Sequence, residues 1–245
     1  MESNTLKDKC ILITGASRGI GKAIALACSS QGANVILTGR NTEKLEAVCQ
    51  DIQMKGGKAQ YFVFDLQDEI SIQNNINTIL HQVGDVDVLI NNAGMGHWSK
   101  IDDTSIEIWD QVMNVNCRST FLMCKLLLPH MYKKKQGHII NISSVMTTRS
   151  VQNLAAYISS KAAVDAFTKC LYAEAKQHNV KVTLLSPSQV DTEFRDNMTE
   201  RAPMSSSQKA KMLQPADVAD AIIWLLNTSP RSIPVSLNIE MQGEQ

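Results

Sequence analysis

Three residue types that together can move a proton to or from a carbonyl oxygen lie between positions 144 and 161. Tyr157 and Lys161 are four residues apart in a segment with helical spacing of its apolar residues, so they are neighbours on one helix face. A nearby ammonium favours the ionised form of a phenol, whose ordinary pKa is about 10. The hydroxyl of Ser144 can hold a substrate oxygen beside the phenol. The set suits carbonyl reduction or alcohol oxidation, although a tyrosine and a lysine at this spacing also occur by chance.

The elements around these residues predict how they are positioned. The apolar run 138–142 is short, β-branched and followed by Ser143 and Ser144, which predicts a buried strand that delivers its serines to the end of a sheet. A helix is expected to begin at about Ala155 and to carry Tyr157. The strand and the helix are therefore expected to present the serine and the phenol together.

A glycine-rich turn lies between an expected first strand, residues 9–14, and an expected helix. Gly15 permits a tight turn, Gly19 lets the backbone approach a pyrophosphate, and Gly21 lets the helix pack close to the strand. A glycine triplet alone is weak evidence, but one between a strand and a helix is much more specific. The turn therefore predicts a dinucleotide-binding site.

The end of the next expected strand, residues 34–38, indicates which dinucleotide is preferred. An NAD site usually places an acidic residue there, whereas this chain has Gly39 and Arg40, with Arg18 in the glycine-rich turn. Two guanidinium groups and no carboxylate favour NADP(H) over NAD(H), because a 2′-phosphate needs cations. The alternative is that Arg40 is a solvated loop residue.

Strands and helices alternate along the rest of the chain. Helices are expected over 42–54, 67–82, 104–128 and 215–227, and strands over 59–64, 86–90, 180–185 and 233–241. This alternation predicts an α/β fold: a single-domain Rossmann fold with a doubly wound, seven-stranded parallel sheet and helices on both faces. Residues 193–214 are polar and weakly periodic, the composition of a substrate lid.

Polar residues at expected strand ends lie where open α/β sheets bind ligands. Residues 91–94 follow the fourth strand and are expected to border the cofactor, although they also make a good turn. Asp65 can accept a hydrogen bond from an adenine amino group or cap the next helix. Asn116 is either a satisfied core amide or a residue that holds water or a carbonyl beside the site.

Length and composition exclude several classes of protein. The 245 residues are 44% hydrophobic and carry no net charge, so one globular domain is expected and nothing global attracts nucleic acid or a membrane. No apolar run approaches the ~20 residues of a membrane span, and the polar amino terminus lacks a signal core, so a cytoplasmic location is expected. The six cysteines are scattered, and no metal site is expected.

With these motifs assembled, the chain resembles the short-chain dehydrogenase/reductase family over nearly its whole length. The matching pieces, in the family's order and approximate spacing, are Thr14-Gly15-x-x-x-Gly19-x-Gly21, Asn91-Asn92-Ala93-Gly94, Asn116, Ser144 and Tyr157-x-x-x-Lys161. The resemblance implies an NADP(H)-dependent enzyme that reduces a ketone or aldehyde to an alcohol, or catalyses the reverse. A catalytically silent NADP-binding scaffold or redox sensor is the alternative, but such proteins typically lose a catalytic residue.

The resemblance also implies a role for each catalytic residue. Tyr157 is the general acid in reduction and the general base in oxidation, while Lys161 lowers the pKa of the phenol and binds the nicotinamide ribose. Ser144, thirteen residues before Tyr157, holds the substrate oxygen, and Asn116 supports a proton-relay water. The implied cofactor-binding residues are Gly15, Ser17, Arg18, Gly19, Ile20, Gly21, Arg40, Asp65, Leu66, Asn92, Ala93, Gly94, Tyr157, Lys161, Pro187, Val190 and Thr192.

The substrate is less determined. Ser188 follows Pro187 where the family usually has glycine, and residues 238–241 lack the Asp-Gly-Gly ending of its fatty-acid-type reductases. The expected substrate is therefore a small 3-oxo or 3-hydroxy compound, or a β-keto thioester carried on acyl carrier protein or CoA. Residues 133–135, three lysines, either face an acidic carrier or form a solvated helix end. The resemblance further implies a homodimer or homotetramer formed through the helices of Asn116 and Tyr157.

Overall fold

Strand β1 (Cys10–Thr14) is buried along its whole length, because both of its faces are covered. Ile11 and Ile13 belong to one hydrophobic cluster and Leu12 to another, as the alternation of side chains along a strand requires. An apolar run without polar interruption is typical of a strand in a parallel sheet with helices on both faces. The computed structural model describes residues 5–195, 198 and 205–242.

Within the described residues, seven strands form one sheet in which all neighbouring pairs are parallel. Their order across the sheet is β3-β2-β1-β4-β5-β6-β7. The strands after β1 are β2 (Asn34–Gly39), β3 (Lys58–Val63), β4 (Val88–Asn91), β5 (Gly137–Ile142), β6 (Val180–Pro187) and β7 (Ser236–Ile239). The predicted fold class is confirmed.

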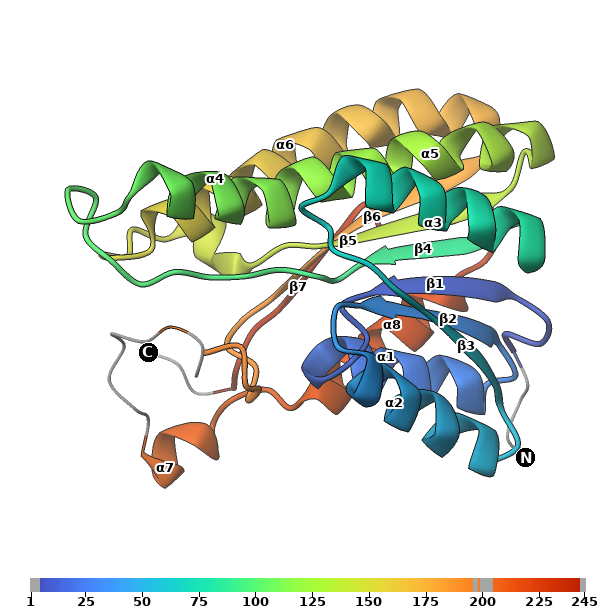
Figure 1. Cartoon of the computed structure of the whole chain (residues 1–245), viewed down its shortest axis with the longest axis horizontal. Helices are drawn as coiled ribbons and strands as arrows, with labels where there is room; N and C mark the ends of the chain where they lie inside the picture. Colours follow the sequence, from blue (N-terminus) through green and yellow to red (C-terminus); the bar gives the residue numbers. More distant parts are fainter. Residues whose placement is uncertain (1–4, 196–197, 199–204, 243–245) are drawn as a thin grey trace.

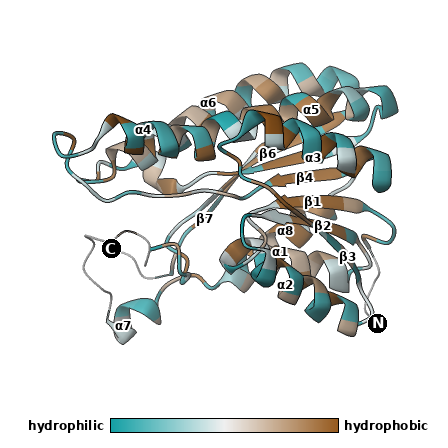
Figure 2. Ribbon diagram, in the orientation of Figure 1, coloured by the Kyte–Doolittle hydropathy of each residue, from teal (hydrophilic) through white to brown (hydrophobic). Residues whose placement is uncertain are grey.

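Helices cover the sheet in two layers (Figure 1). One layer contains α1 (Gly19–Ser30), α2 (Thr42–Met54) and α8 (Pro215–Leu226). The other contains α3 (Glu69–Gln82), α4 (Ile106–Met113), α5 (Ser119–Lys134) and α6 (Ala155–Ala175). Figure 2 shows apolar residues concentrated on the strands and on the helix surfaces that face them. Among the residues described above, no helix has the length and apolar composition needed to cross a membrane.

The order of the strands changes direction at β1, since β2 and β3 lie on one side of it and β4 on the other. Open α/β sheets bind ligands at the carboxyl edge beside such a point, because the two neighbouring connections leave on opposite faces. The short helix α7 (Ser206–Lys209) stands apart from both helical layers at this edge of the sheet (Figure 1). The lid expected over 193–214 lies partly outside the described residues.

The helix expected over 104–128 differs from the structure at both ends. It begins at Ile106 with Ser105 as its cap, because the Ser105 hydroxyl accepts a hydrogen bond of 3.3 Å from the amide of Ile108. At the other end, α5 continues past Pro129 to Lys134. The proline removes one backbone donor, and burial of the surrounding apolar side chains keeps the helix intact.

The same segment is interrupted by a π-helical turn, Asn114–Arg118, between α4 and α5. Such turns widen a helix locally and occur frequently at functional sites. Here the turn contains Asn116, whose side chain is fully buried. The interruption therefore sets the position of a residue that the sequence had already singled out.

Candidate active site

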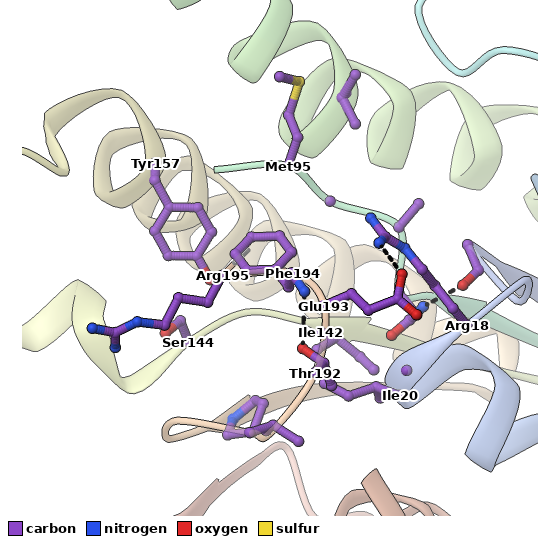
Figure 3. A pocket seen from close by; sticks show the side chains of 18 of the residues that line it. Arg18, Ile20, Met95, Ile142, Ser144, Tyr157, Thr192, Glu193, Phe194 and Arg195 are labelled. Atoms are coloured by element: carbon purple, nitrogen blue, oxygen red, sulfur yellow. Dashed lines mark hydrogen bonds and ion pairs between the residues drawn. The ribbon is translucent and has the colours of Figure 1, made fainter. Parts of the chain in front are cut away.

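A pocket of about 310 Å³ lies at the carboxyl edge of the sheet and is bordered by both the glycine-rich turn and the start of α6. This volume is within the usual range of small-molecule sites. Figure 3 shows Arg18 and Ile20 at one end of the pocket and Tyr157 and Ser144 at the other. The glycine-rich turn and the set of Ser144, Tyr157 and Lys161 thus border one cavity.

Hydrogen bonds join the ends of β1 and β4 under the pocket. The Thr14 hydroxyl accepts from the backbone amides of Asn92 and Ala93, each at 3.0 Å. In return, the Asn92 side-chain amide donates to the carbonyl oxygens of Thr14 at 2.8 Å and Gly15 at 3.3 Å. Asn92 therefore holds the glycine-rich turn against the end of β4.

The turn has no room for side chains at two of its glycines. Gly15 has a φ of +67°, and a Cβ atom there would lie 2.9 Å from the Cα atom of Ala93. A Cβ atom on Gly21 would lie 2.4 Å from the carbonyl oxygen of Gly15. The bare backbone leads directly into α1, whose amino-terminal N–H groups favour an anion. These residues fit a dinucleotide with its pyrophosphate at the start of α1.

The two serines after β5 have different partners. The Ser144 hydroxyl lies near the phenol of Tyr157, whose pKa it lowers, and accepts from the amide of Met146 at 3.2 Å. The Ser143 hydroxyl instead donates to the carboxylate of Asp165 on α6. Of the two serines, Ser144 is therefore the one that lies near Tyr157.

The pKa of Tyr157 is raised above its ordinary value, and burial is the largest cause. The nearby Ser144 hydroxyl lowers this pKa, whereas the carboxylate of Asp165 raises it further. The net direction is opposite to the one expected from a lysine one turn away. Burial outweighs the other effects because removing water destabilises the phenolate.

The position of Lys161 is one reason why the pKa of Tyr157 is not lowered. Its Nζ atom donates a hydrogen bond of 2.7 Å to the carbonyl oxygen of Ile142, at the end of β5. The side chain is buried, and burial lowers the pKa of Lys161 to about 8, although Asp165 raises it. A backbone carbonyl thus holds the ammonium at the wall of the pocket.

Asn116 is a satisfied core amide. Its Nδ2 atom donates to the carbonyl oxygen of Met95 and to Ser160 Oγ, and its Oδ1 atom accepts from the amide of Met95, all at 2.8 Å. The Asn116 carbonyl oxygen accepts from the hydroxyl of Thr120 at 2.9 Å. Asn116 does not itself line the pocket. Its side chain supports the pocket wall at Met95, so its implied contact with a relay water remains a prediction.

Two cations at the other end of the pocket share one carboxylate. Arg18 Nη1 lies 2.7 Å from Glu193 Oε2, and Lys44 Nζ lies 3.4 Å from the same oxygen (Figure 3 shows the Arg18 pair). Glu193 follows β6, so this contact joins the expected lid to the glycine-rich turn. Of these three side chains, only Arg18 was predicted from the sequence to bind the cofactor.

Arg40 lies at the same end and is largely exposed. Its guanidinium is 3.7 Å from the carboxylate of Asp65. The N-cap of α3 is Asp68, which accepts from the amides of Ile70 and Ser71. The capping alternative for Asp65 is therefore wrong, and this carboxylate lines the pocket.

Comparison with known proteins identifies the family. A family model described as short chain dehydrogenase matches residues 9–203. The chain belongs to the short-chain dehydrogenase family. An uncharacterized oxidoreductase of Staphylococcus epidermidis, similar to this chain, is 35% identical over 231 residues, which cover 94% of this chain and 96% of that protein.

Solved short-chain dehydrogenases have the same fold. A metagenomic short-chain oxidoreductase in complex with NADP is 32% identical, with a TM-score of 0.85, and the match covers 98% of this chain and 100% of that one. A 3-oxoacyl-[acyl-carrier protein] reductase from Brucella melitensis with bound NAD is 28% identical, with a TM-score of 0.85, and the match covers 97% and 92%. These similarities support a nicotinamide cofactor and do not distinguish NADP from NAD.

The structure brings together nearly all the residues that the sequence predicted for the site. Gly21 and Asn116 lie behind the pocket, and the other predicted residues line it. Several other lining side chains were not named individually from the sequence, because they come from short segments without periodic spacing, some of them in the expected lid 193–214. These are Met95, Met146, Leu154, Glu193, Phe194, Arg195, Met198 and Met212. Within the described ranges, no cluster of residues suited to a metal ion is found.

Proposed function

We propose that this short-chain dehydrogenase is an NADP(H)-dependent oxidoreductase that interconverts a carbonyl and an alcohol, with Tyr157 as its proton carrier. The observation that carries the proposal is that Ser144, Tyr157 and Lys161 lie together at the wall of a pocket that also reaches the glycine-rich turn. When bound, the dinucleotide supplies or accepts a hydride at its nicotinamide ring.

Residues of the protein supply the proton that the substrate oxygen receives during reduction. In reduction, the Ser144 hydroxyl holds the substrate oxygen and Tyr157 gives its proton to that oxygen. The raised pKa of Tyr157 keeps the phenol protonated at neutral pH, as a general acid requires. The ammonium of Lys161 lies one helical turn away and, with a pKa of about 8, is mostly charged at pH 7. Its charge stabilises the phenolate that remains.

The preference for NADP(H) rests on Arg18 and Arg40. Both line the pocket at the end where the glycine-rich turn meets the end of β2, and arginine can bind a phosphate through two parallel hydrogen bonds. The similar structure with bound NADP supports this preference, while the one with bound NAD gives it no support. The two arginines therefore carry this part of the proposal.

We propose a small carbonyl compound as the substrate, with a β-keto thioester as the competing class. Lys134 forms ion pairs with Asp85 and Asp87, at 3.6 and 3.0 Å, beside the amino ends of the strands. The active site is at the carboxyl ends, roughly 20 Å away along a six-residue strand. This geometry favours a structural role for the lysine run. Because the chain is similar to a 3-oxoacyl-[acyl-carrier protein] reductase, thioester substrates must also be assayed.

The test is the loss of NADPH absorbance by the purified protein with two sets of substrates: 3-oxoacyl thioesters, and small aldehydes or 3-oxo acids. Turnover with the small carbonyls alone is the expected result. Turnover confined to thioesters would assign the chain to β-keto thioester reduction. A protein that binds NADPH but reduces neither set would contradict the enzymatic proposal and favour a binding-only role.

We also propose that the protein is a homo-oligomer formed through α4, α5 and α6. Ile106, Trp109 and Phe121 on this surface are 70%, 37% and 46% exposed. Phe121 also lies edge-on to Phe167 of α6, with ring centroids 5.9 Å apart. A surface with several large apolar side chains is typical of an interface.

A cytoplasmic location completes the proposal. Cys28 and Cys124 are fully buried, and burial raises the pKa of each thiol to about 12. Protonated, buried thiols are suited to a reducing compartment.

A further inference from the structure

Glu193 places a carboxylate among the cations that are proposed to recognise a 2′-phosphate. One of its oxygens contacts Arg18 at 2.7 Å and Lys44 at 3.4 Å. Hydrogen bonds from these two side chains hold the pKa of Glu193 below its ordinary value, so the carboxylate is charged at neutral pH. An anion supplied by the protein therefore already binds Arg18.

The charges of the neighbouring side chains indicate what a bound phosphate would do. Arg18, Arg40 and Lys44 carry three positive charges, and Glu193 and Asp65 carry two negative ones, which leaves a net charge of +1. A phosphate monoester adds about two negative charges at neutral pH. With Glu193 in place the group would become negative, whereas without it the charges balance. Electrostatics therefore favours the departure of Glu193.

The ion pairs of Glu193 are weak enough to be exchanged. The side chains of Arg18, Lys44 and Glu193 are 40%, 48% and 57% exposed, so water and salt screen their attraction. A phosphate dianion offers Arg18 more charge and two oxygens for parallel hydrogen bonds. The exchange of one anion for the other is therefore accessible without unfolding any of the sheet.

The position of Glu193 in the chain connects this exchange to the rest of the pocket. Its neighbour Thr192 packs against the glycine-rich turn, since a Cβ atom on Gly19 would lie 3.2 Å from Thr192 Cγ2. Its other neighbour, Phe194, has its ring centroid 5.7 Å from that of Tyr157. Glu193 thus tethers a short segment that borders both the cofactor end and the catalytic end.

We propose that Glu193 is a specificity-determining residue for the cofactor. Its carboxylate competes within the molecule for Arg18, so a 2′-phosphate must displace it and the affinity for phosphorylated dinucleotides is selectively reduced. The inference rests on the proposed NADP(H) dependence. It goes beyond that proposal because it assigns an opposing role to an acidic residue of the lid.

The test compares 2′,5′-ADP with 5′-AMP, two probes that lack the nicotinamide and differ in the 2′-phosphate. Their dissociation constants are measured by calorimetry on the full chain and on Glu193→Gln and Glu46→Gln. Glu46 is an exposed residue of α2 whose carboxylate accepts a hydrogen bond from Gln50, and its substitution removes the same charge. Glu193→Gln should bind 2′,5′-ADP about three- to tenfold more tightly and 5′-AMP within about twofold of the unmodified protein. Glu46→Gln should change neither by more than about twofold.

The outcomes separate this inference from the proposed function. Equal affinity of the unmodified protein for the two probes would overturn the NADP(H) preference and the inference with it. A preference for 2′,5′-ADP that is unchanged in Glu193→Gln would overturn the inference alone. Weaker binding of 2′,5′-ADP by Glu193→Gln would also overturn it, because Glu193 would then be holding Arg18 ready for the phosphate. In 1 M salt the advantage of Glu193→Gln should shrink, since the ion pairs are exposed.

Discussion

Asn116 donates a hydrogen bond of 2.8 Å from its side-chain amide to Ser160 Oγ. The Ser160 hydroxyl in turn donates to the backbone carbonyl of Tyr157 at 2.7 Å. The π-helical turn is thereby linked to the backbone of the proposed proton carrier. Because the Asn116 side chain also binds both backbone groups of Met95, one amide connects two walls of the pocket.

Substitution of Asn116 should destabilise the protein strongly. Asn116→Ala leaves the amide and carbonyl of Met95 without their partner, and we expect the free energy of unfolding to fall by about 2–4 kcal/mol. Asn74→Ala, at an exposed position of α3, should change it by less than about 0.5 kcal/mol. Urea unfolding of both variants is the measurement. Equal stability of the two would show that the buried network contributes little.

Removal of the Tyr157 hydroxyl should abolish turnover without loss of binding. Tyr157→Phe keeps the ring that packs against Phe194 and removes the proton donor, so we expect turnover to fall by several orders of magnitude. The affinity for NADPH should stay within about twofold. Tyr132→Phe, on α5 beside His178, is the matched control and should remain active. Activity of Tyr157→Phe near that of the unmodified protein would rule out the proposed proton transfer.

A buried histidine should make the protein sensitive to acid. The Thr183 hydroxyl donates to the carbonyl of Pro234, so His138 donates to Thr183 through a protonated Nε2 atom, at 2.9 Å, and its ring is neutral. Burial, with a smaller effect of Lys181, lowers the pKa of His138 to about 3. The unfolded chain takes up this proton near pH 6.5, so stability is lost as the pH falls from 6.5 toward 3.

At pH 5 this single group should cost about 2 kcal/mol relative to pH 7. His138→Gln keeps a donor for Thr183 but cannot titrate, so its free energy of unfolding should fall by about 2 kcal/mol less over the same range. Urea unfolding at pH 7 and pH 5 measures the difference. Parallel losses in the two proteins would show that His138 is not the acid-sensitive group.

Removal of the Arg40 charge should affect the two cofactors unequally. Arg40→Gln should weaken NADPH binding about tenfold and NADH binding by less than about twofold, because only NADPH carries the 2′-phosphate. Arg231→Gln, at an exposed position after α8, should leave both unchanged. Fluorescence titration with each cofactor gives the dissociation constants. An equal loss for the two would mean that Arg40 does not read the phosphate.

A charge on the proposed interface should dissociate the oligomer. Phe121→Glu places a carboxylate on α5 among apolar side chains, so we expect sedimentation to shift from an oligomer to a monomer. Met54→Glu, at a position of α2 that is 81% exposed, should leave the assembly intact. An unmodified protein that sediments as a monomer would contradict the interface.

Parts of the site follow from local sequence alone. The glycine-rich turn was predictable because Gly15 and Gly21 occupy places where a Cβ atom would meet the neighbouring backbone. The pairing of Tyr157 with Ser144 was predictable from a strand end and a helix start. The length of the helix after Ser105 was not, since burial of its apolar face outweighs the local effect of Pro129.

The sequence by itself determined the fold class, the glycine-rich turn and the proposed catalytic set, because each depends on residue spacing within one or two neighbouring elements. Only the tertiary structure decided the ion pairs and the pKa values of these groups. The contact between Arg18 and Glu193 joins residues 175 positions apart, which no local pattern encodes. The raised pKa of Tyr157 and the lowered pKa of Lys161 follow from burial by several elements at once. Water exclusion and long-range ion pairs exist only after the chain has packed.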